Sequence, residues 1–365
     1  MSEYAALQID KEWLVNQPFN FFGPCSAESL AQMLGTAEEI AKFSSTSIFR
    51  AGVWKPRTRP NTFEGIGSVG LEWLKEVKAT YGFQTATEVA NGKHVELALE
   101  AGVDILWIGA RTTVNPFSVQ EIAEVLKGVD VPVFVKNPIH ADLSLWIGAL
   151  ERINQVGITK LGAIHRGFHD GNSLPYRNAP KWQLALELKR IFNNLPIVCD
   201  ASHISGNPKL IPSVAQKSLD LNMDGLMIET HIDPNTALSD AQQQVNPTLL
   251  QEILTSLTYR SDHIDNDLFT NKLEEFRSDI DKIDEQLIDL MAKRMELVKH
   301  IGAYKKENKV TVFQLERWKA ILERTNHMGA PLGLNENFIN GLFNVIHDES
   351  IRQQTEVINL DNKEV

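Results

Sequence analysis

The amino-acid sequence predicts an α/β fold: a (β/α)8 barrel followed by a small all-α domain of three helices that dimerises. Over roughly the first 250 residues, short β-rich runs alternate eight times with segments of helical length, which is the pattern of a closed barrel of parallel strands. Glycine and proline then almost disappear from a long segment whose apolar residues recur at helical spacing. The length of 365 residues accommodates one large domain and one small one.

The barrel elements can be assigned in chain order. The predicted strands are Phe19–Cys25, Ser47–Gly52, Gln84–Val89, Ile105–Ala110, Val131–Asn137, Lys160–Gly167, Ile197–His203 and Gly225–His231. The predicted helices include Glu28–Phe43, Ser68–Tyr81, Lys93–Ala101, Ser118–Lys127, Ala141–Val156, Pro180–Asn193 and Pro208–Asn222. A doubly wound open sheet is the alternative, but that fold predicts fewer strands and usually a glycine-rich turn after the first one.

The character of the chain changes near residue 259. We therefore expect a barrel domain over residues 1–258, a linker over 259–270 and a helical domain over 271–365. The stretch Ser261–Asp267 is polar and acidic, as linkers commonly are. Three helices are predicted after it, at Asn271–Asn308, Val312–His327 and Asn335–Gln354.

The first of these helices carries an apolar stripe that needs a partner. Its apolar residues recur in steps of three and four, which is a heptad pattern. They are Leu273, Phe276, Ile280, Ile283, Leu287, Leu290, Leu297 and Ile301. A helix of this length extends roughly 55 Å and cannot bury the stripe against itself. We therefore expect partner helices and a homodimer through the helical domain.

The composition bears on several classes of function. A net charge of −11 disfavours binding to nucleic acid. Cys25 and Cys199 are the only cysteines, so no disulfide framework exists and a reducing compartment is expected. No apolar run approaches the ~18 residues of a membrane span. The first residues lack the basic start and the apolar core of a signal peptide, so we expect a cytoplasmic protein without a membrane partner.

Four residues near the ends of predicted strands are candidates to bind a metal ion. Cys25 ends the first run, and the carboxyl ends of barrel strands are where chemistry is placed. The others, at or beyond the last two strands, are His203, Glu229 and Asp240. Taken singly, Cys25 could be an ordinary buried cysteine, and each of the other three could be an ordinary polar residue of a loop. Together they offer sulfur, nitrogen and oxygen ligands, which suit a divalent transition metal such as Mn, Fe, Co or Zn.

Basic side chains form a second set at the same strand ends. They are Arg50, Lys55, Arg57, Arg111, Lys136 and Arg166. A charge at the end of a barrel strand is costly unless it is paired, so six of them on one rim indicate anionic ligands. The fork of arginine matches both phosphate and carboxylate groups. A ring of surface salt bridges is the alternative, but we expect few matching acids on this rim.

Several of these residues lie in motifs that resemble deoxy-arabino-heptulosonate-phosphate (DAHP) synthases of the smaller bacterial subtype. The motifs are Gly23-Pro24-Cys25-Ser26, Lys55-Pro56-Arg57-Thr58, Ile108-Gly109-Ala110-Arg111, His165-Arg166-Gly167 and Asp200-Ala201-Ser202-His203. The resemblance covers nearly all of residues 1–255, and the related octulosonate-phosphate synthases carry a different sequence in place of Lys-Pro-Arg-Thr. His165 stands where many members carry an acidic or an apolar residue.

The resemblance implies a metal-dependent condensation of phosphoenolpyruvate with erythrose 4-phosphate. The residues that it assigns are Cys25, His203, Glu229 and Asp240 for the metal; Arg50 and the catalytic Lys55 for the phosphoenolpyruvate carboxylate; Arg111, Lys136 and Arg166 for its phosphate; and Arg57 and Thr58 for the sugar phosphate. An octulosonate-phosphate synthase, which consumes arabinose 5-phosphate, is the rival activity.

Arg294 occupies the apolar stripe, where an unpaired charge disfavours packing unless it binds a buried anion. Lys305 lies eleven residues further, about three turns, and shares the same helix face. Arg277 is roughly 25 Å away along the axis and about a quarter turn off that face. Arg277 and Arg294 of one straight helix therefore cannot hold one small anion, whereas two antiparallel copies bring them together.

This part of the chain resembles the all-helical chorismate mutases. The matching segments are Phe276-Arg277, Ile283-Asp284, Arg294–Val298, Ile301–Lys305, Arg317 and Ser350–Gln354. The resemblance implies rearrangement of chorismate to prephenate without a cofactor, in an intertwined dimer in which one arginine crosses from the other subunit. The implied site residues are Arg277, Arg294, Lys305, Arg317, Ser350 and Gln354.

The helical domain departs from this pattern at two positions and leaves an alternative open. Gln314 and Trp318 stand where many mutases carry acidic residues. The alternative is a barrel synthase whose helical tail serves only in dimerisation and sensing. Because only about twenty residues precede the first strand, too few for a separate regulatory domain, we also expect prephenate or chorismate to inhibit the barrel through the helical domain.

Overall fold

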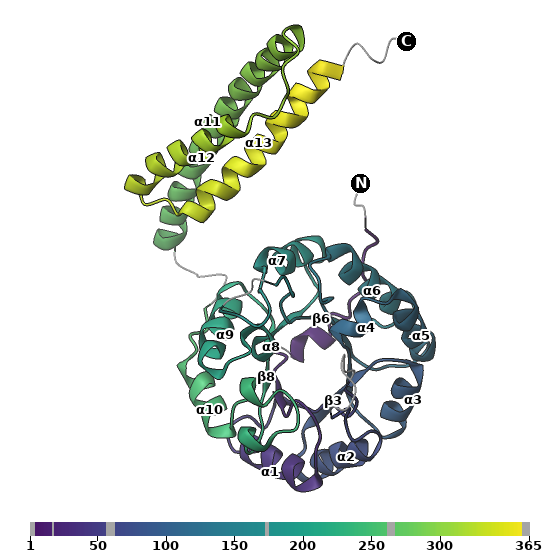
Figure 1. The fold of residues 1–365 in the computed structure, drawn as a ribbon. Coiled ribbons are helices and arrows are strands. Elements are labelled where there is room, and N and C mark those ends of the chain that lie inside the picture. Colours follow the sequence, from purple (N-terminus) through teal and green to yellow (C-terminus); the bar gives the residue numbers. More distant parts are fainter. Residues whose placement is uncertain (1–3, 17, 56–62, 172–174, 261–266, 360–365) are drawn as a thin grey trace. The chain divides into compact units, whose positions relative to one another are not determined.

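The computed structural model describes residues 4–16, 18–55, 63–171, 175–260 and 267–359. The chain divides into two compact units, Met1–Asp262 and His263–Val365. The first unit is an α/β barrel and the second is all-helical (Figure 1).

Eight parallel strands close into a barrel in which each strand pairs with the next along the chain and β8 pairs with β1. The strands are β1 (Phe21–Gly23), β2 (Ile48–Arg50), β3 (Gln84–Val89), β4 (Ile105–Ile108), β5 (Val133–Lys136), β6 (Leu161–His165), β7 (Ile197–Asp200) and β8 (Gly225–Glu229). This topology is the predicted (β/α)8 barrel and excludes the open sheet.

Helices form a ring around these strands (Figure 1). The α-helices of this unit are α1 (Leu30–Ala41), α2 (Val69–Tyr81), α3 (Gly92–Glu100), α4 (Ala110–Thr113), α5 (Pro116–Leu126), α6 (Leu143–Gln155), α7 (Trp182–Ile191), α8 (Ala201–Ser205), α9 (Ile211–Asp220) and α10 (Pro247–Ser256). Four short 3-10 helices accompany them among the described residues: η1 (Trp13–Asn16), η2 (Pro208–Leu210), η3 (Pro234–Thr236) and η4 (Ala241–Gln243).

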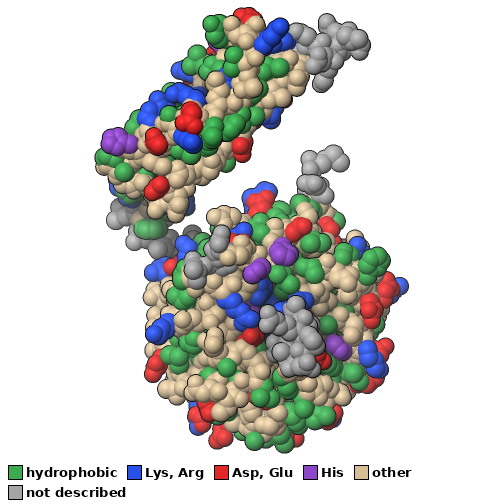
Figure 2. Space-filling model, viewed as in Figure 1, with side chains coloured by type: hydrophobic (Ala, Val, Ile, Leu, Met, Phe, Trp, Pro, Cys, Tyr) green, Lys and Arg blue, Asp and Glu red, His purple; other side chains and the backbone are tan. Residues whose placement is uncertain are grey.

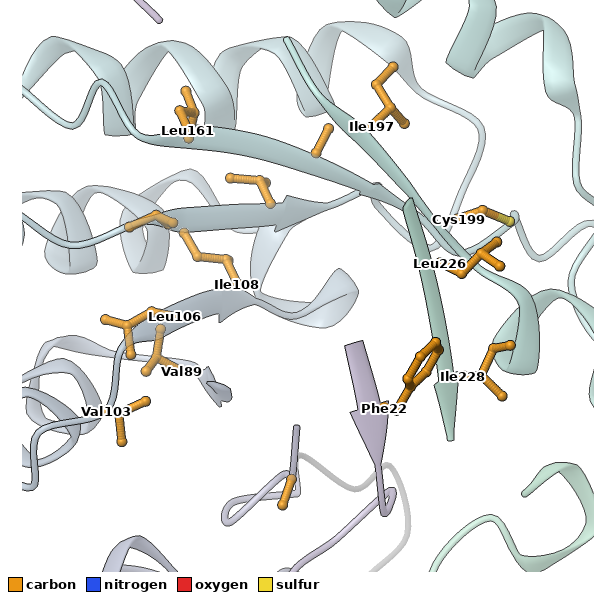
Figure 3. Close-up of a cluster of buried hydrophobic side chains, with 14 of the residues drawn as sticks. Phe22, Val89, Val103, Leu106, Ile108, Leu161, Ile197, Cys199, Leu226 and Ile228 are labelled. Atoms are coloured by element: carbon orange, nitrogen blue, oxygen red, sulfur yellow. The ribbon is translucent and has the colours of Figure 1, made fainter. Parts of the chain in front are cut away.

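The strands are buried on both faces, apart from β3, in which Gln84 is exposed and Glu88 is half-buried. In β4, Ile105 and Trp107 point into the barrel interior, whereas Leu106 and Ile108 belong to the larger apolar layer under the helices. Figure 3 shows part of this outer layer. Because neither face of the other strands meets water, most strands are continuous apolar runs rather than alternating ones, which is why they stand out in the sequence.

Aromatic side chains fill the amino-terminal end of the barrel interior. Trp13 of η1 stacks on Phe19, with ring centroids 4.6 Å apart, and both rings contact the edge of Phe134. Phe21 packs against the same Phe134 at 5.1 Å. This end is therefore closed by packing, and polar chemistry is left to the carboxyl ends of the strands.

The eight predicted strands are confirmed, but several are shorter than predicted. The run Ile197–His203 is a strand only to Asp200, because the Asp200 side chain accepts a hydrogen bond from the backbone N–H of His203 and caps α8. The segment Gly65–Gly70 has the spacing G-x-G-x-x-G of dinucleotide-binding turns. It precedes α2 rather than following the first strand, so the spacing carries no such meaning in this closed barrel.

The second unit consists of α11 (Asp267–Glu307), α12 (Leu315–Gly329), η5 (Ala330–Leu332) and α13 (Glu336–Asn359). The three predicted helices are therefore present. Val298 of α11 and Ile346 of α13 are buried between them. Gly302 permits a close approach, since a Cβ there would lie 3.1 Å from the Cα of Gln354.

The predicted apolar stripe of α11 stays exposed within one chain. Phe276, Ile280 and Leu290 are each more than half exposed, and so is Leu297. Neither α12 nor α13 covers this face among the described residues. The stripe is therefore left uncovered by the described residues, and the predicted dimer that would cover it stays a prediction.

Among the described residues, no helix combines the length and the apolar character that a membrane span requires.

Gly23 allows the end of β1 to approach the backbone of Arg50 on β2, and replacing Gly23 tests how much this approach matters for stability. Gly23 has φ +138°, and a Cβ there would collide with the carbonyl oxygen of Arg50. We expect Gly23→Ala to lower the free energy of unfolding by about 3 kcal/mol or more, from strain and overpacking together. Gly82→Ala is the control. Gly82 has φ +75°, but a Cβ there would meet open space, so we expect the free energy of unfolding to fall by only about 1 kcal/mol. Equal losses in urea-unfolding curves of the two variants would contradict this account.

Candidate active sites

Three side chains at the carboxyl ends of the strands form a cluster able to hold a metal ion. Cys25 follows β1, Glu229 ends β8, and Asp240 lies in the loop after β8. Their ligand atoms all lie within 4.8 Å of one another. Gln243 donates to Glu229 Oε2 at 2.6 Å, and Gln244 accepts from the Cys25 N–H at 3.0 Å, so both amides fix the cluster. The sulfur and oxygen donors suit a divalent transition metal.

The surroundings of Cys25 hold its thiol in the protonated form. Burial, with a smaller contribution from Glu229, raises the pKa of its thiol to about 12, and Lys55 opposes this shift. The Lys55 Nζ lies 3.1 Å from Sγ. A cysteine binds metal as the thiolate, so binding must release this proton. The Glu229 Oε1 is buried without a hydrogen-bond partner among the described residues, although the Arg50 guanidinium lies 3.4 Å from it.

His203 lies beside this cluster but is not one of the three converging residues. It belongs to α8 rather than to a strand end. Its Nδ1 is 2.9 Å from Asp200 Oδ2 and 3.8 Å from Glu229 Oε1. Asp200 thus holds the ring through Nδ1 and leaves Nε2 for a metal, which is the usual arrangement around a histidine ligand.

Two of the predicted substrate-binding cations are paired with buried carboxylates. Lys136 Nζ lies 2.7 Å from Asp200, and Arg50 Nη1 lies 3.4 Å from Glu229. Burial alone would raise the pKa of Asp200, but His203 and Lys136 outweigh it and hold this pKa well below its usual value. The pKa of Glu229 is lowered in the same way, because His203 and Arg50 outweigh burial. The expectation of few acids on this rim was therefore wrong for Arg50 and Lys136.

A cavity of ≈ 590 Å³ brings together the three cations predicted to bind phosphate. Arg111, Lys136 and Arg166 all line it. Figure 2 shows basic side chains gathered near the middle of one face of the barrel. Burial lowers the pKa of Arg166 to about 10, which still leaves it charged at neutral pH, and Asn178 accepts its Nη1 hydrogen bond at 2.7 Å. The cavity therefore offers a fixed cationic pocket for an anion.

His165 takes an apolar role beside this pocket. It is fully buried, and its ring lies 6.3, 5.8 and 5.2 Å from those of Trp146, Phe168 and Trp182. Burial lowers the pKa of His165 to about 3, so the ring is neutral. It therefore supports Arg166 by packing rather than by charge.

Arg57 and Thr58, predicted to hold the sugar phosphate, lie outside the described residues.

Sequence reasoning missed other residues that line the cavity, among them Glu88, Arg177 and Asn178. Arg177 Nη1 lies 3.1 Å from Asp240 Oδ1 and also bonds to Gln243, so it joins the cavity to the metal cluster. Arg177 lies in the loop between β6 and α7, well beyond the strand end. The only signal for it is a basic residue in a long loop on the functional face of a barrel.

In the second unit, α11 and α13 bring three predicted residues together. Arg294 donates to Ser350 Oγ at 2.7 Å, and Gln354 donates to the Ser350 carbonyl at 3.2 Å. Lys305 donates to the Val312 carbonyl at 2.6 Å. Burial lowers the pKa of both Arg294 and Lys305.

The remaining predicted residues of this site do not converge within one chain. Arg277 is 61% exposed and pairs with Glu274 of its own helix at 2.6 Å. Arg317 is exposed on α12. Trp318 stacks on His347, with ring centroids 4.0 Å apart. The separation of Arg277 from the Arg294 group agrees with the helix geometry predicted for it.

Comparison with known proteins bears on both units. A family model described as "DAHP synthetase I family" matches residues 16–265, and one described as "Chorismate mutase type II" matches residues 276–355. A phospho-2-dehydro-3-deoxyheptonate aldolase of Thermotoga maritima is 28% identical over 243 residues, which cover 66% of this chain and 69% of that protein. The crystal structure of a Thermotoga maritima DAHP synthase aligns with a TM-score of 0.58 and 27% identity, over 65% of this chain and 67% of that one.

Two further relatives are informative. A 2-dehydro-3-deoxyphosphooctonate aldolase of Helicobacter acinonychis is 26% identical over 260 residues, which cover 64% of this chain and 92% of that protein. A bifunctional chorismate mutase/prephenate dehydratase of Buchnera aphidicola subsp. Schizaphis graminum is 38% identical over 89 residues, 24% of this chain. This last similarity spans only 23% of the relative.

The fold and the site define a (β/α)8-barrel enzyme with a cationic pocket beside a possible metal site, joined to an all-helical domain. The first family model covers more than half of the chain, so the chain belongs to the DAHP synthetase I family, with a chorismate mutase type II domain after the barrel. It is therefore an enzyme of aromatic biosynthesis with a synthase domain and a mutase domain.

The buried Asp200 carboxylate makes barrel stability depend on pH. Because its folded pKa is depressed, its contribution is fully present above the unfolded pKa near ~4 and is lost as the pH falls through the lower folded value. We expect Asp200→Asn to remove this part of the acid sensitivity and to cost about 3 kcal/mol at pH 7, since Lys136 loses its partner. Unfolding of metal-free protein between pH 7 and acid measures both effects.

Asp130→Asn is the matched control for this substitution. Asp130 also pairs with a lysine, Lys160, at 2.7 Å, but its side chain is 81% exposed. Its loss should change stability by less than about 1 kcal/mol. Acid sensitivity that is the same in Asp200→Asn and in the unsubstituted protein would show that the buried pair has no such role.

Proposed function

We propose that this chain is a bifunctional enzyme that condenses phosphoenolpyruvate with erythrose 4-phosphate and rearranges chorismate to prephenate. The observation that carries the first activity is the convergence of Arg111, Lys136 and Arg166 on one cavity beside the Cys25 cluster. We take the domain bounds as residues 1–258 and 271–365 with a linker over 259–270, supported by the two compact units. A cytoplasmic location and the absence of nucleic-acid and membrane partners remain predictions.

In the synthase site, this chain's residues position two anions that would otherwise repel each other. Arg111, Lys136 and Arg166 bind the phosphate of phosphoenolpyruvate, and Arg50 and Lys55 bind its carboxylate. Arg57 and Thr58 bind the phosphate of the sugar. Because both substrates are held in a fixed orientation, the bimolecular step becomes effectively unimolecular, and the repulsion between the two anions is overcome on binding.

Cys25, His203, Glu229 and Asp240 would hold the metal, which we propose to be a divalent transition metal such as Mn, Fe, Co or Zn. When bound, such an ion polarises the aldehyde oxygen of the sugar. Lys55 links this cluster to the carboxylate site, because its Nζ lies 3.1 Å from Cys25 Sγ. Asp200 keeps His203 oriented through Nδ1, so the ligand is preorganised.

The mutase activity needs a second copy of the chain. Arg294 and Ser350 form one side of the site, and Gln354 extends it. Arg277 of a partner copy would complete it, since the two arginines of one helix are too far apart. Arg294 and Arg277 bind the substrate carboxylates, with Arg317 completing the site, and Lys305 and Gln354 face the ether oxygen, where negative charge develops.

We also propose that prephenate or chorismate, bound at the mutase site, inhibits the synthase. A ligand that bridges two copies of the helical domain favours a compact dimer. Coupling of ~1–3 kcal/mol between the two sites suffices for feedback. In the alternative, the helical domain binds prephenate or chorismate but does not catalyse the rearrangement. This alternative predicts that the synthase is inhibited while chorismate is not consumed.

Assaying both reactions on one purified sample of the full chain tests the proposal. We expect consumption of phosphoenolpyruvate with erythrose 4-phosphate and loss of chorismate. Consumption of arabinose 5-phosphate instead would identify the octulosonate-phosphate activity and refute the synthase assignment. Stable chorismate would support the non-catalytic alternative.

Cys25→Ser should lower the condensation rate at least about 100-fold while sparing mutase activity, because a hydroxyl replaces the thiolate ligand. A chelator should have the same effect, and added manganese should reverse it. Cys199→Ala is the control, since Cys199 is buried in the apolar layer under the helices. Full condensation activity in chelated protein would exclude the metal.

Arg294→Ala should lower mutase activity by about 10²–10³-fold, with stability unchanged within about 1 kcal/mol. It should also abolish inhibition of condensation by prephenate. Arg352→Ala, which removes an exposed arginine of α13, should leave both activities intact. Prephenate inhibition that persists in Arg294→Ala would place the sensor elsewhere, and a large stability loss with intact mutase activity would make Arg294 structural.

A further inference from the structure

The ring of Trp107 lies close to two cations that the proposed function assigns to the substrate, and it has no role in the functions proposed above. It is on β4, points into the barrel interior and is fully buried. Its ring centroid lies 4.9 Å from Cζ of Arg50 and 5.8 Å from Nζ of Lys136. Both distances are within the range at which an aromatic ring attracts a cation. One indole therefore contacts a cation assigned to the carboxylate and a cation assigned to the phosphate.

Carboxylates alone balance these two cations incompletely. The Nε of Arg50 is buried without a hydrogen-bond partner among the described residues, and its pair with Glu229 spans 3.4 Å. Lys136 shares its carboxylate, Asp200, with His203. Buried cations need further stabilisation. An aromatic face supplies it without neutralising them, so both remain able to bind an anionic substrate.

Glu88 holds the indole in place and enriches its face with electrons. The Trp107 Nε1–H donates to Glu88 Oε2 at 3.0 Å. A charge-assisted bond of this kind is strong, and it polarises the ring so that its face attracts cations better. Gly109 makes room for the carboxylate, because a Cβ there would collide with Glu88 Oε1. Residues 88, 107 and 109 thus form one local arrangement.

We propose that Trp107 is a positioning residue of the synthase: its indole face, oriented by Glu88, holds Arg50 and Lys136 at the spacing that receives phosphoenolpyruvate. The proposal rests on the roles given to Arg50 and Lys136 in the proposed function. An apolar side chain of similar size would fill the same space but would not attract the two cations. The expected signature is therefore in the affinity for phosphoenolpyruvate rather than in folding.

Fluorination tests the ring electrostatics with little change in shape. The seven tryptophans of the chain are replaced by 5-fluorotryptophan, which withdraws electrons from the face. We expect the Kd for phosphoenolpyruvate, measured by calorimetry on the full chain with manganese, to rise about threefold. The same labelling in a Trp107→Phe background should leave the Kd unchanged, because the other six rings contribute nothing.

Substitutions give an independent measure. Trp107→Phe keeps an aromatic face and should raise the KM for phosphoenolpyruvate about threefold, whereas Trp107→Leu removes the face and should raise it about tenfold or more. The KM for the sugar phosphate and kcat should change less. Trp146→Phe is the matched control: Trp146 is equally buried, and its indole donates to the Val135 carbonyl at 3.0 Å. It should lower stability without changing the KM for phosphoenolpyruvate.

The outcomes separate this proposal from the proposed function. If the labelled enzyme is active but its Kd for phosphoenolpyruvate is the same as without fluorine, the positioning role is overturned. Trp107 then only fills space. Equal KM values in the Phe and Leu variants lead to the same conclusion. If Trp107→Leu does not fold, the fluorinated full-length protein still decides. An unsubstituted chain that neither binds nor condenses phosphoenolpyruvate refutes the proposed function itself.

Discussion

The buried carboxylates at the carboxyl ends of β7 and β8 are the constraint on which the synthase site depends. Asp200 holds Lys136 and the ring of His203, and Glu229 faces Arg50 while belonging to the Cys25 cluster. Without these acids, cations inside the barrel mouth would lose more in desolvation than they gain in contacts. With them, the depressed pKa values of both carboxyls keep the site ionised at neutral pH. In the proposed function, Arg111 and Arg166 attract the substrate phosphate together with Lys136.

The two units differ in how much of a site one chain supplies. The barrel positions its cations, its metal cluster and its closed aromatic base from elements within one unit. The helical unit supplies Arg294, Ser350 and Gln354 together but leaves Arg277 on an exposed surface. The exposed stripe on α11 adds a packing reason for a second copy. The same partner would thus complete both the packing and the site of the helical unit.

Much of the barrel was predictable because each strand and its end can be recognised from a short stretch of sequence. Parallel strands buried on both faces are apolar runs, and the cation that follows such a run marks the functional rim, as for Arg111 and Lys136. His203 was misplaced because a side-chain cap, from Asp200, starts a helix where the apolar run continues. Arg177 and Trp107 could not be found in this way. Arg177 reaches the site from a long loop, and Trp107 looks like any interior residue until the barrel closes around it.

The central claim is that one rim of the barrel gathers a metal and an anionic substrate. A crystal structure of the full chain soaked with manganese and phosphoenolpyruvate, with anomalous data at the manganese edge, tests it most directly. The account predicts one anomalous peak bonded to Cys25, His203, Glu229 and Asp240. It also predicts the substrate phosphate within hydrogen-bond distance of Arg111, Lys136 and Arg166. A manganese peak elsewhere, or a phosphate bound away from these three cations, would contradict it.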